Sequence, residues 1–215
     1  MRAWLVGEPV QGSPLPFSFT ERPEPVPGPG QVRVKVRACG VCHTDLHMAD
    51  GELRPSRLPR VPGHQVVGEV DQVGAGVDLP LGSRVGVPWL HRACEACEFC
   101  ARGEENLCPQ AQFTGLDVDG GYAQWTLAQA AYVIPLPDGI AASDQAPLLC
   151  AGIIGYRSLR RARVESGERV GLFGFGASAH LALQILRHWD CEVFAFTRSQ
   201  GHRRHALALG ANWAG

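Results

Sequence analysis

The chain has 215 residues, which is enough for one large or two ordinary domains. Its 45% hydrophobic and 19% charged residues are typical of a globular protein, and a formal net charge of −1 argues against nucleic acid or a membrane surface as partner. No apolar run reaches the roughly 18 residues of a transmembrane helix, and the first residues lack a secretory signal. We therefore expect a cytoplasmic protein, in which eight cysteines favour metal or catalytic roles over disulfides.

Up to about residue 150 the sequence predicts strands and loops. The first ten residues indicate an opening strand, and residues 21–30 form a proline-rich connector. Residues 31–40 place Val32, Val34 and Val36 on one face, with basic residues on the other, which predicts a half-buried strand. Two further short strands are expected within 64–74 and 83–89.

Beyond residue 150 the pattern changes to alternating helices and strands. Residues 151–164 predict a helix, and residues 177–189 predict a second one. Apolar runs at 170–173 and 193–196 show no polar alternation, as expected of strands buried on both faces. Together they predict one βαβ unit of a parallel sheet, with the sequence ending just before a third strand.

Four cysteines lie within the stretch CEACEFCARGEENLC, which runs from Cys94 to Cys108 and includes Cys97 and Cys100. Tetrahedral zinc in a structural site takes four such ligands, and the two-residue gaps let successive sulfurs face one ion. Iron–sulfur clusters also take four cysteines, but their usual runs are spaced differently. Four unrelated buried thiols are the remaining alternative. The sequence predicts a structural zinc site, because no ligand position is left open.

Three other stretches are weak signals when taken singly: CGVCHTDLH (39–47), PGHQVVGE (62–69) and PLLCAGIIGY (147–156). A histidine before a strand is more often a core or surface residue than a ligand, and Cys150 is most simply a core thiol. Residues 44–47 would be an ordinary polar turn that caps a helix. Cys39 forms a C-x-x-C with Cys42, but the preceding strand favours a plain buried thiol over a redox pair.

The stretch GFGASAH, residues 174–180, lies between a predicted strand and a predicted helix, as a dinucleotide-binding turn does. Gly174 permits the tight turn, Gly176 lets the backbone approach a pyrophosphate, and the helix start offers free N–H groups. The cofactor-binding residues predicted here are Gly174, Gly176, Ala177, Ser178 and Ala179. The alternative is a glycine turn that only packs the strand on the helix.

The end of the second predicted strand selects the nucleotide. An NAD enzyme places an acidic residue there to bind the ribose hydroxyls, but this sequence offers Thr197, Arg198 and Ser199 instead. A hydroxyl group and an arginine suit a 2′-phosphate. The sequence therefore favours NADP(H) over NAD(H) as cofactor.

As a set, GVCHTDLH, GHQVVGEV, the four-cysteine loop, DGGYAQW, LLCAGIIGY and GFGASAH resemble the zinc-dependent alcohol dehydrogenases of the medium-chain superfamily, from the first residue to the last. The resemblance implies a mainly β, GroES-like catalytic domain over 1–150, followed over 151–215 by the start of an α/β Rossmann domain with a doubly wound parallel sheet. It implies two zinc ions per chain, the catalytic one held by Cys42, His64 and Cys150. Three protein ligands would leave the fourth position to substrate.

The resemblance also implies roles for neighbouring residues. Thr44 would take the proton of the alcohol, and His47 would pass it towards solvent. Asp45 would orient His64, and Gln65, where many relatives have Glu, removes a negative charge near the zinc. Two further implied residues are His43, which would contact cofactor phosphate, and Trp89, which would line the substrate pocket.

The expected activity is interconversion of a small alcohol with an aldehyde or ketone by hydride transfer to or from a nicotinamide cofactor. The family implies a further stretch that carries the nicotinamide half, so we expect either a fragment of a longer enzyme or a naturally truncated product. A homo-oligomer, dimer or tetramer, is expected at full length. The alternative function is a non-catalytic zinc-binding relative of the same fold, which the presence of every ligand and relay residue disfavours.

Overall fold

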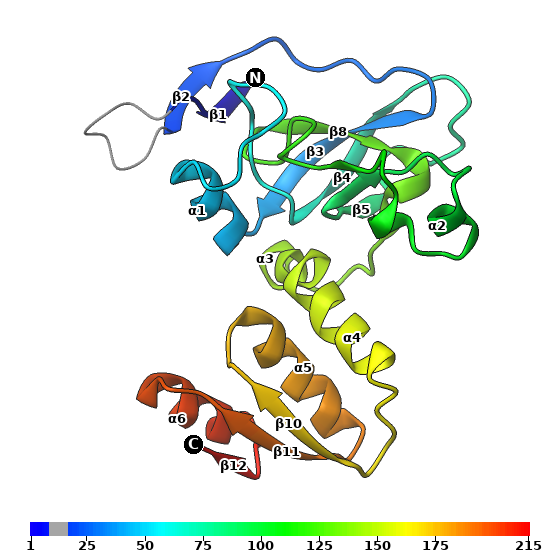
Figure 1. Cartoon of the computed structure of the whole chain (residues 1–215). Helices are drawn as coiled ribbons and strands as arrows, with labels where there is room; N and C mark the ends of the chain where they lie inside the picture. Colours follow the sequence, from blue (N-terminus) through cyan, green and yellow to red (C-terminus); the bar gives the residue numbers. More distant parts are fainter. Residues whose placement is uncertain (9–16) are drawn as a thin grey trace. The chain divides into compact units, whose positions relative to one another are not determined.

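The computed structural model describes residues 1–8 and 17–215. These residues form two compact units, Met1–Leu149 and Cys150–Gly215. The N-terminal unit is mainly β and the C-terminal unit is α/β (Figure 1). The division falls one residue before the boundary expected from the sequence.

A five-stranded antiparallel sheet in the order β8-β3-β4-β5-β9 organises the N-terminal unit. Its strands are β3 (Gln31–Cys39), β4 (Val66–Val73), β5 (Arg84–Val87), β8 (Trp125–Gln129) and β9 (Ile134–Pro135). The strands β3, β4 and β5 occupy the stretches in which the sequence predicts strands.

The alternating valines of β3 place its inner face in the core. Val32 and Val34 are fully buried and pack with valines of β4 and β5. The register with β4 shifts between Val36 and Ala38, a local irregularity that ends with Cys39 opposite Val66. The end of β3 and the start of β4 therefore lie side by side, and the loops that leave this end of the sheet carry the candidate site.

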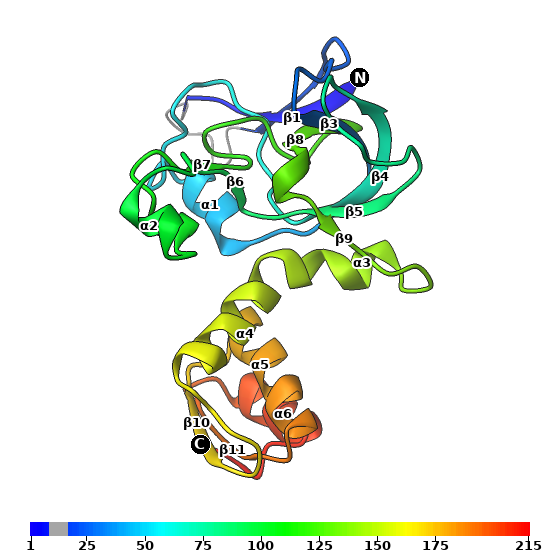
Figure 2. The same cartoon turned by 90° about the vertical axis from the view of Figure 1, so that its right-hand side faces the viewer.

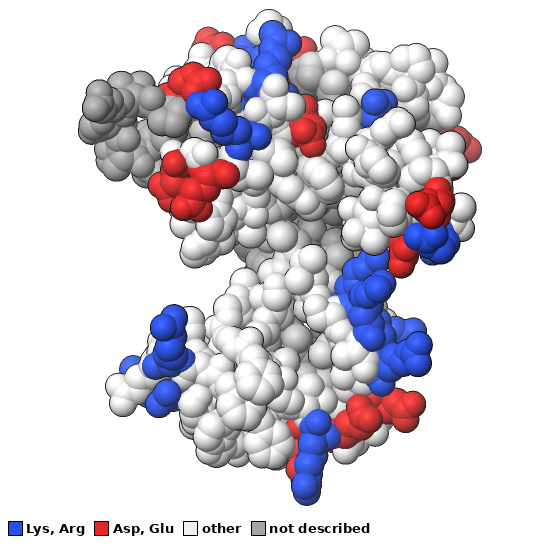
Figure 3. Space-filling view, viewed as in Figure 1, with Lys and Arg blue, Asp and Glu red and all other residues white. Residues whose placement is uncertain are grey.

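The remaining elements of the N-terminal unit are short. Strands β1 (Arg2–Val6) and β2 (Phe17–Glu21) pair antiparallel, as do β6 (Leu90–Arg92) and β7 (Gln112–Phe113). The helical segments are α1 (His43–Ala49), α2 (Glu98–Ala101), η1 (Glu105–Leu107), η2 (Ala130–Tyr132), α3 (Ala142–Gln145) and η3 (Ala146–Leu149). Acidic and basic side chains are interspersed over the face of this unit that Figure 3 shows.

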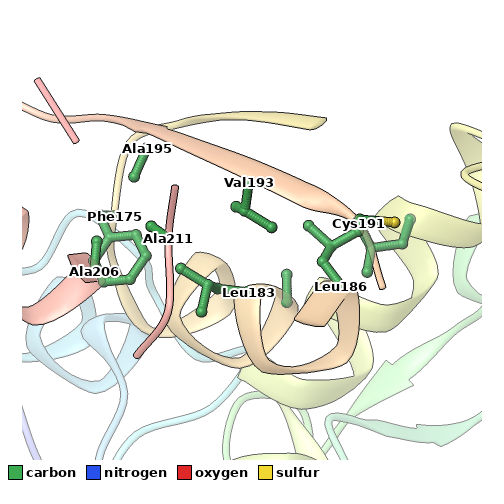
Figure 4. Close-up of a cluster of buried hydrophobic side chains, with 10 residues drawn as sticks. Phe175, Leu183, Leu186, Cys191, Val193, Ala195, Ala206 and Ala211 are labelled. Atoms are coloured by element: carbon green, nitrogen blue, oxygen red, sulfur yellow. The ribbon is translucent and has the colours of Figure 1, made fainter. Parts of the chain in front are cut away.

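The C-terminal unit is built on a parallel three-stranded sheet in the order β10-β11-β12. Its elements are α4 (Ala151–Arg161), β10 (Arg169–Phe173), α5 (Ala177–His188), β11 (Glu192–Phe196), α6 (Gln200–Ala208) and β12 (Trp213–Ala214). The helices α5 and α6 follow their strands on the same side of the sheet, as Figure 2 shows. Their inner faces meet the strands in one apolar cluster that includes Leu183, Leu186, Val193, Ala195 and Ala206 (Figure 4).

Two expectations about this sheet are wrong. Strand β10 is not buried on both faces: Phe173 is 84% exposed, and its ring stacks on Phe196 at 4.5 Å between centroids. The reason is that the described helices cover only one face, so Phe173, Phe196 and Trp213 remain exposed on the other. The third strand is also already present, because β12 pairs with β11.

Candidate functional site

Three ligand-type side chains from distant parts of the sequence meet where β3 ends and β4 begins. Cys42 directly precedes α1, His64 lies just before β4, and Cys150 directly precedes α4. One ligand atom of each side chain lies within 4.8 Å of the other two. This three-ligand site, Cys42, His64 and Cys150, is the set that the family resemblance implies for catalytic zinc.

The position of Cys150 follows from the N-terminal unit, because Cys150 is bonded to that unit's last residue. Leu149 is 3% exposed and packs with Val67 and Ala146. It lies so close to Gly86 that a Cβ there would come within 2.5 Å of its side chain. Because Gly86 in β5 has no side chain, Leu149 can pack closely against that strand. Leu149 is buried in the core, and this fixes the place at which Cys150 follows it.

Asp45 connects two of the ligands. Its Oδ2 atom accepts a hydrogen bond from the Cys42 N–H at 2.8 Å, and its Oδ1 atom lies 3.8 Å from Nδ1 of His64. Asp45 and His64 are 2% and 1% exposed, and neither Oδ1 nor Nδ1 has a hydrogen-bond partner among the described residues. A carboxylate beside one ring nitrogen fixes the tautomer and leaves the other nitrogen for a metal. The buried pair and the two thiols therefore fit a zinc ion.

The two predicted relay residues lie on the first turns of α1. The Cys42 thiol lies 3.7 Å from Oγ1 of Thr44, so Thr44 borders the three-ligand site. His47 is exposed, and its Nδ1 atom pairs with the carboxylate of Glu52, a residue that sequence reasoning missed. His43 is exposed as well, with its ring 5.3 Å from that of His47. On α1, the Thr44 hydroxyl therefore lies beside the three-ligand site, and the His47 imidazole lies at the protein surface.

Trp89 and Gln65 flank His64. The Trp89 ring meets His64 edge-on at 4.7 Å between centroids, and it stacks on Phe113 at 5.0 Å. Trp89 therefore forms an aromatic wall beside the three-ligand site. Gln65 is buried, and its side chain lies against Gly40, where a Cβ would come within 3.2 Å of it.

The four cysteines of the loop form a second ligand group. The Sγ atoms of Cys94, Cys97, Cys100 and Cys108 all lie within 4.8 Å of one another. Cys97 and Cys100 are 3.5 Å apart at sulfur, and the N–H groups of Cys94 and Gln110 donate to Cys108 Sγ at 3.4 and 3.3 Å. Backbone N–H donors stabilise thiolates, so this four-cysteine site suits a closed tetrahedral metal.

The thiols differ in how readily they ionise. Backbone hydrogen bonding from Ala96, followed by the contact with Cys108, lowers the pKa of Cys94 to about 6. Burial, followed by the contact with Cys97, raises the pKa of Cys100 to about 12. Burial likewise raises the pKa of Cys39 to about 12, which fits the plain buried thiol expected there.

The glycine-rich turn lies between β10 and α5. Gly174 has a φ of 88°, which requires glycine, and Gly176 is the residue before α5. A Cβ at Gly176 would meet nothing within 4 Å, so the space before the helix is open. Ala177, Ser178 and Ala179 form the first turn of the helix, whose N–H groups face that opening.

A pocket of about 580 Å³ adjoins this turn. It is lined by Gly174, Phe196, Thr197, Arg198, Ser199, His202, Arg203 and Gly215, none of which is acidic. The Arg203 Nε–H donates to the Thr197 carbonyl at 2.7 Å, and the Ser199 hydroxyl accepts from the His202 N–H at 3.3 Å. His202 and Arg203 thus join the predicted Thr197, Arg198 and Ser199 in a basic pocket.

The family of the chain is clear from comparison with known proteins. The model of the alcohol dehydrogenase GroES-like domain matches residues 28–138, about half of the chain. The chain therefore belongs to the alcohol dehydrogenase family with a GroES-like domain, which confirms the family and the fold class that the sequence motifs indicate.

Particular relatives extend the match beyond that domain. The chain is 50% identical over 182 residues to a probable alcohol dehydrogenase AdhA of Mycobacterium tuberculosis, covering 82% of this chain and 53% of that protein. It is similar to the solved structures of CAD from Helicobacter pylori complexed with NADP(H), at TM-score 0.88 and 28% identity, covering 99% and 63% of the two chains. Acetophenone reductase from Geotrichum candidum in complex with NAD gives TM-score 0.86 and 30% identity, covering 100% and 62%. The chain spans about half the length of the curated relatives that it matches.

Within residues 1–8 and 17–215, every helix is too short or too polar to cross a bilayer.

Proposed function

We propose that the protein is a zinc-dependent oxidoreductase that interconverts an alcohol with an aldehyde or ketone by hydride transfer to or from a nicotinamide cofactor. The observation that carries this proposal is the three-ligand site, with its buried Asp45–His64 pair. Three ligands suit a catalytic zinc, whereas the four-cysteine site has no position to spare.

At the three-ligand site, Cys42, His64 and Cys150 would hold Zn²⁺, which supplies Lewis-acid polarisation of the substrate oxygen. Two thiolates and a neutral imidazole balance the charge of the ion, and Gln65 adds no charge beside it. Asp45 keeps His64 in one tautomer and orientation. Trp89, edge-on to His64, would line the pocket for the hydrocarbon part of the substrate.

The proton of the alcohol needs a path to water. We assign its removal to Thr44 Oγ1, because that hydroxyl borders the three-ligand site. His47 is the exposed imidazole farther along the same helix, and its Nδ1 atom contacts the carboxylate of Glu52. Thr44 and His47 would thus form the inner and outer ends of a proton path from the buried site to solvent.

The cofactor would bind the C-terminal unit. Gly174, Gly176 and the first turn of α5 would receive the pyrophosphate. The pocket with Arg198 and no lining acid favours NADP(H) over NAD(H), because a 2′-phosphate needs cations and an acid would repel it. His43 would contact a cofactor phosphate.

The remaining proposals concern the whole protein. A second zinc ion, at the four-cysteine site, would be structural and bring the count to two per chain. The substrates would be small alcohols and aldehydes, and the assembly a homo-oligomer. We place the protein in the cytoplasm, because six of its eight cysteines belong to the two ligand groups, the use that cysteines have where thiols stay reduced.

The test uses the full-length protein and the matched variants Cys42→Ser and Cys39→Ser. Both positions lie in the same C-x-x-C stretch, but only Cys42 belongs to the three-ligand site. We expect wild type to carry two zinc ions and to oxidise alcohols with NADP, Cys42→Ser to lose turnover and one zinc, and Cys39→Ser to retain both. A zinc-loaded wild type without alcohol or aldehyde turnover would refute the proposal.

A further inference from the structure

The segment Asp119–Tyr122, part of the DGGYAQW motif, lies against the residues that directly precede His64. The N–H groups of Gly120, Gly121 and Tyr122 donate to the carbonyls of Val61, Gly63 and Pro62 at 2.7, 2.9 and 3.0 Å. The carboxylate of Asp119 accepts a fourth hydrogen bond, from the Val61 N–H at 3.1 Å. All three residues before His64 are therefore held by one short segment.

The two glycines allow this contact. A Cβ at Gly120 would lie 2.1 Å from the Gly63 carbonyl oxygen, and a Cβ at Gly121 would lie 2.2 Å from the Val66 side chain. Atoms do not approach so closely, so any larger residue would force the two segments apart. Gly120 and Gly121 therefore allow the backbone of this segment to lie directly against the residues that precede His64. This places the next side chain, Tyr122, beside the three-ligand site.

The Tyr122 side chain crosses from one ligand segment to the other. Its ring lies on Gly63, where a Cβ would come within 2.6 Å of the ring, and its hydroxyl donates to the Gly40 carbonyl at 3.5 Å. A tyrosine hydroxyl carries its proton at neutral pH, so it can donate this hydrogen bond. The side chain thus joins the residue before His64 to the loop that leads into Cys42.

We propose that Tyr122 is a positioning residue for the three-ligand site, holding the Gly40–Asp45 loop and the Gly63–His64 segment in register so that Asp45 faces Nδ1 of His64. The two facing atoms are 3.8 Å apart and have no other described partner, so their alignment depends on the segments that carry them. The inference rests on the proposed function, because it takes the three-ligand site to hold a metal.

The test compares Tyr122→Phe with Tyr156→Phe in the full-length protein. The first variant keeps the ring and removes the hydroxyl; the second is a matched control, since Tyr156 is 47% exposed on α4 of the C-terminal unit. Zinc affinity of each site is measured by competition with a chelator, and the sites are assigned with Cys42→Ser and Cys97→Ser, each of which lacks one. Loss of a group that orients a metal ligand costs about 10–100-fold in affinity.

We expect Tyr122→Phe to lower zinc affinity at the three-ligand site about tenfold and to leave the four-cysteine site unchanged. The kcat for alcohol oxidation should fall while the KM for NADP stays constant. Unchanged affinity in Tyr122→Phe, or equal weakening of both sites, would overturn the inference but leave the proposed function intact. A wild type that binds no zinc at the three-ligand site would overturn both.

Discussion

Substitution of Leu149 tests how the fold positions Cys150. Its side chain is 3% exposed and packs with Val67 and Ala146 over Gly86. Truncation to alanine removes three buried carbon atoms and leaves a cavity, which costs roughly 2–5 kcal/mol in such cores. For a unit of 149 residues, each kcal/mol shifts the melting temperature by about 2–4 °C. We therefore expect Leu149→Ala to lower the melting temperature by roughly 4–20 °C.

The neighbouring residue provides the matched control. Leu148 is 45% exposed, so Leu148→Ala should change stability much less than Leu149→Ala. Both variants are followed by thermal unfolding of the zinc-loaded protein and by zinc retention against a chelator. Leu149→Ala should also release zinc from the three-ligand site more readily, because Cys150 loses its anchor. Equal behaviour of the two variants in both measurements would refute this account of how Cys150 is positioned.

Three further predictions concern the metal, the cofactor and pH. Cys97→Ser should reduce zinc content by one ion and lower the melting temperature, whereas a variant that keeps two ions would contradict the four-cysteine assignment. Arg198→Asp should lower the ratio of kcat/KM for NADP over NAD about 30-fold, since lost attraction and new repulsion each contribute on the order of 1 kcal/mol; wild-type preference for NAD would argue against the proposed pocket chemistry. Burial and the charge of Arg92 lower the pKa of His91 from 6.5 to about 4, so between these pH values the unfolded chain binds more protons than the folded one. Stability should therefore fall as the pH drops through that window, by up to about 3 kcal/mol from this group, and urea titrations of His91→Gln should show a shallower fall; an unchanged pH dependence would exclude His91 as a contributor.

The sequence was sufficient to predict those elements whose signal lies within a few neighbouring residues. The alternation of Val32 and Val34 predicts β3, and the glycine pattern at Gly174 and Gly176 predicts the turn before α5, as the structure shows. The four cysteines could be grouped because they lie within fifteen residues, where only a short loop must close.

The three-ligand site could not be assembled in this way. Cys42, His64 and Cys150 are separated by long stretches, and each has a more ordinary explanation when it stands alone. Only the resemblance to a family grouped them from the sequence, and the sheet brings them together because β3 ends where β4 begins. The positioning contacts of Tyr122 were likewise absent from any sequence pattern, since they depend on the close approach of two backbones.

The exposure of β10 is a second feature that the sequence pattern did not predict. An apolar run such as 170–173 predicts a strand, but it does not state what covers each face, and Phe173 is exposed where burial was expected. The sequence by itself therefore determined the strand β3, the glycine turn before α5, the four-cysteine ligand set and the family, because these depend on residue type and short spacing. Tertiary structure alone decided which faces are covered and how Asp45, His64 and Cys150 meet, because packing joins residues whose separation along the chain carries no local signal.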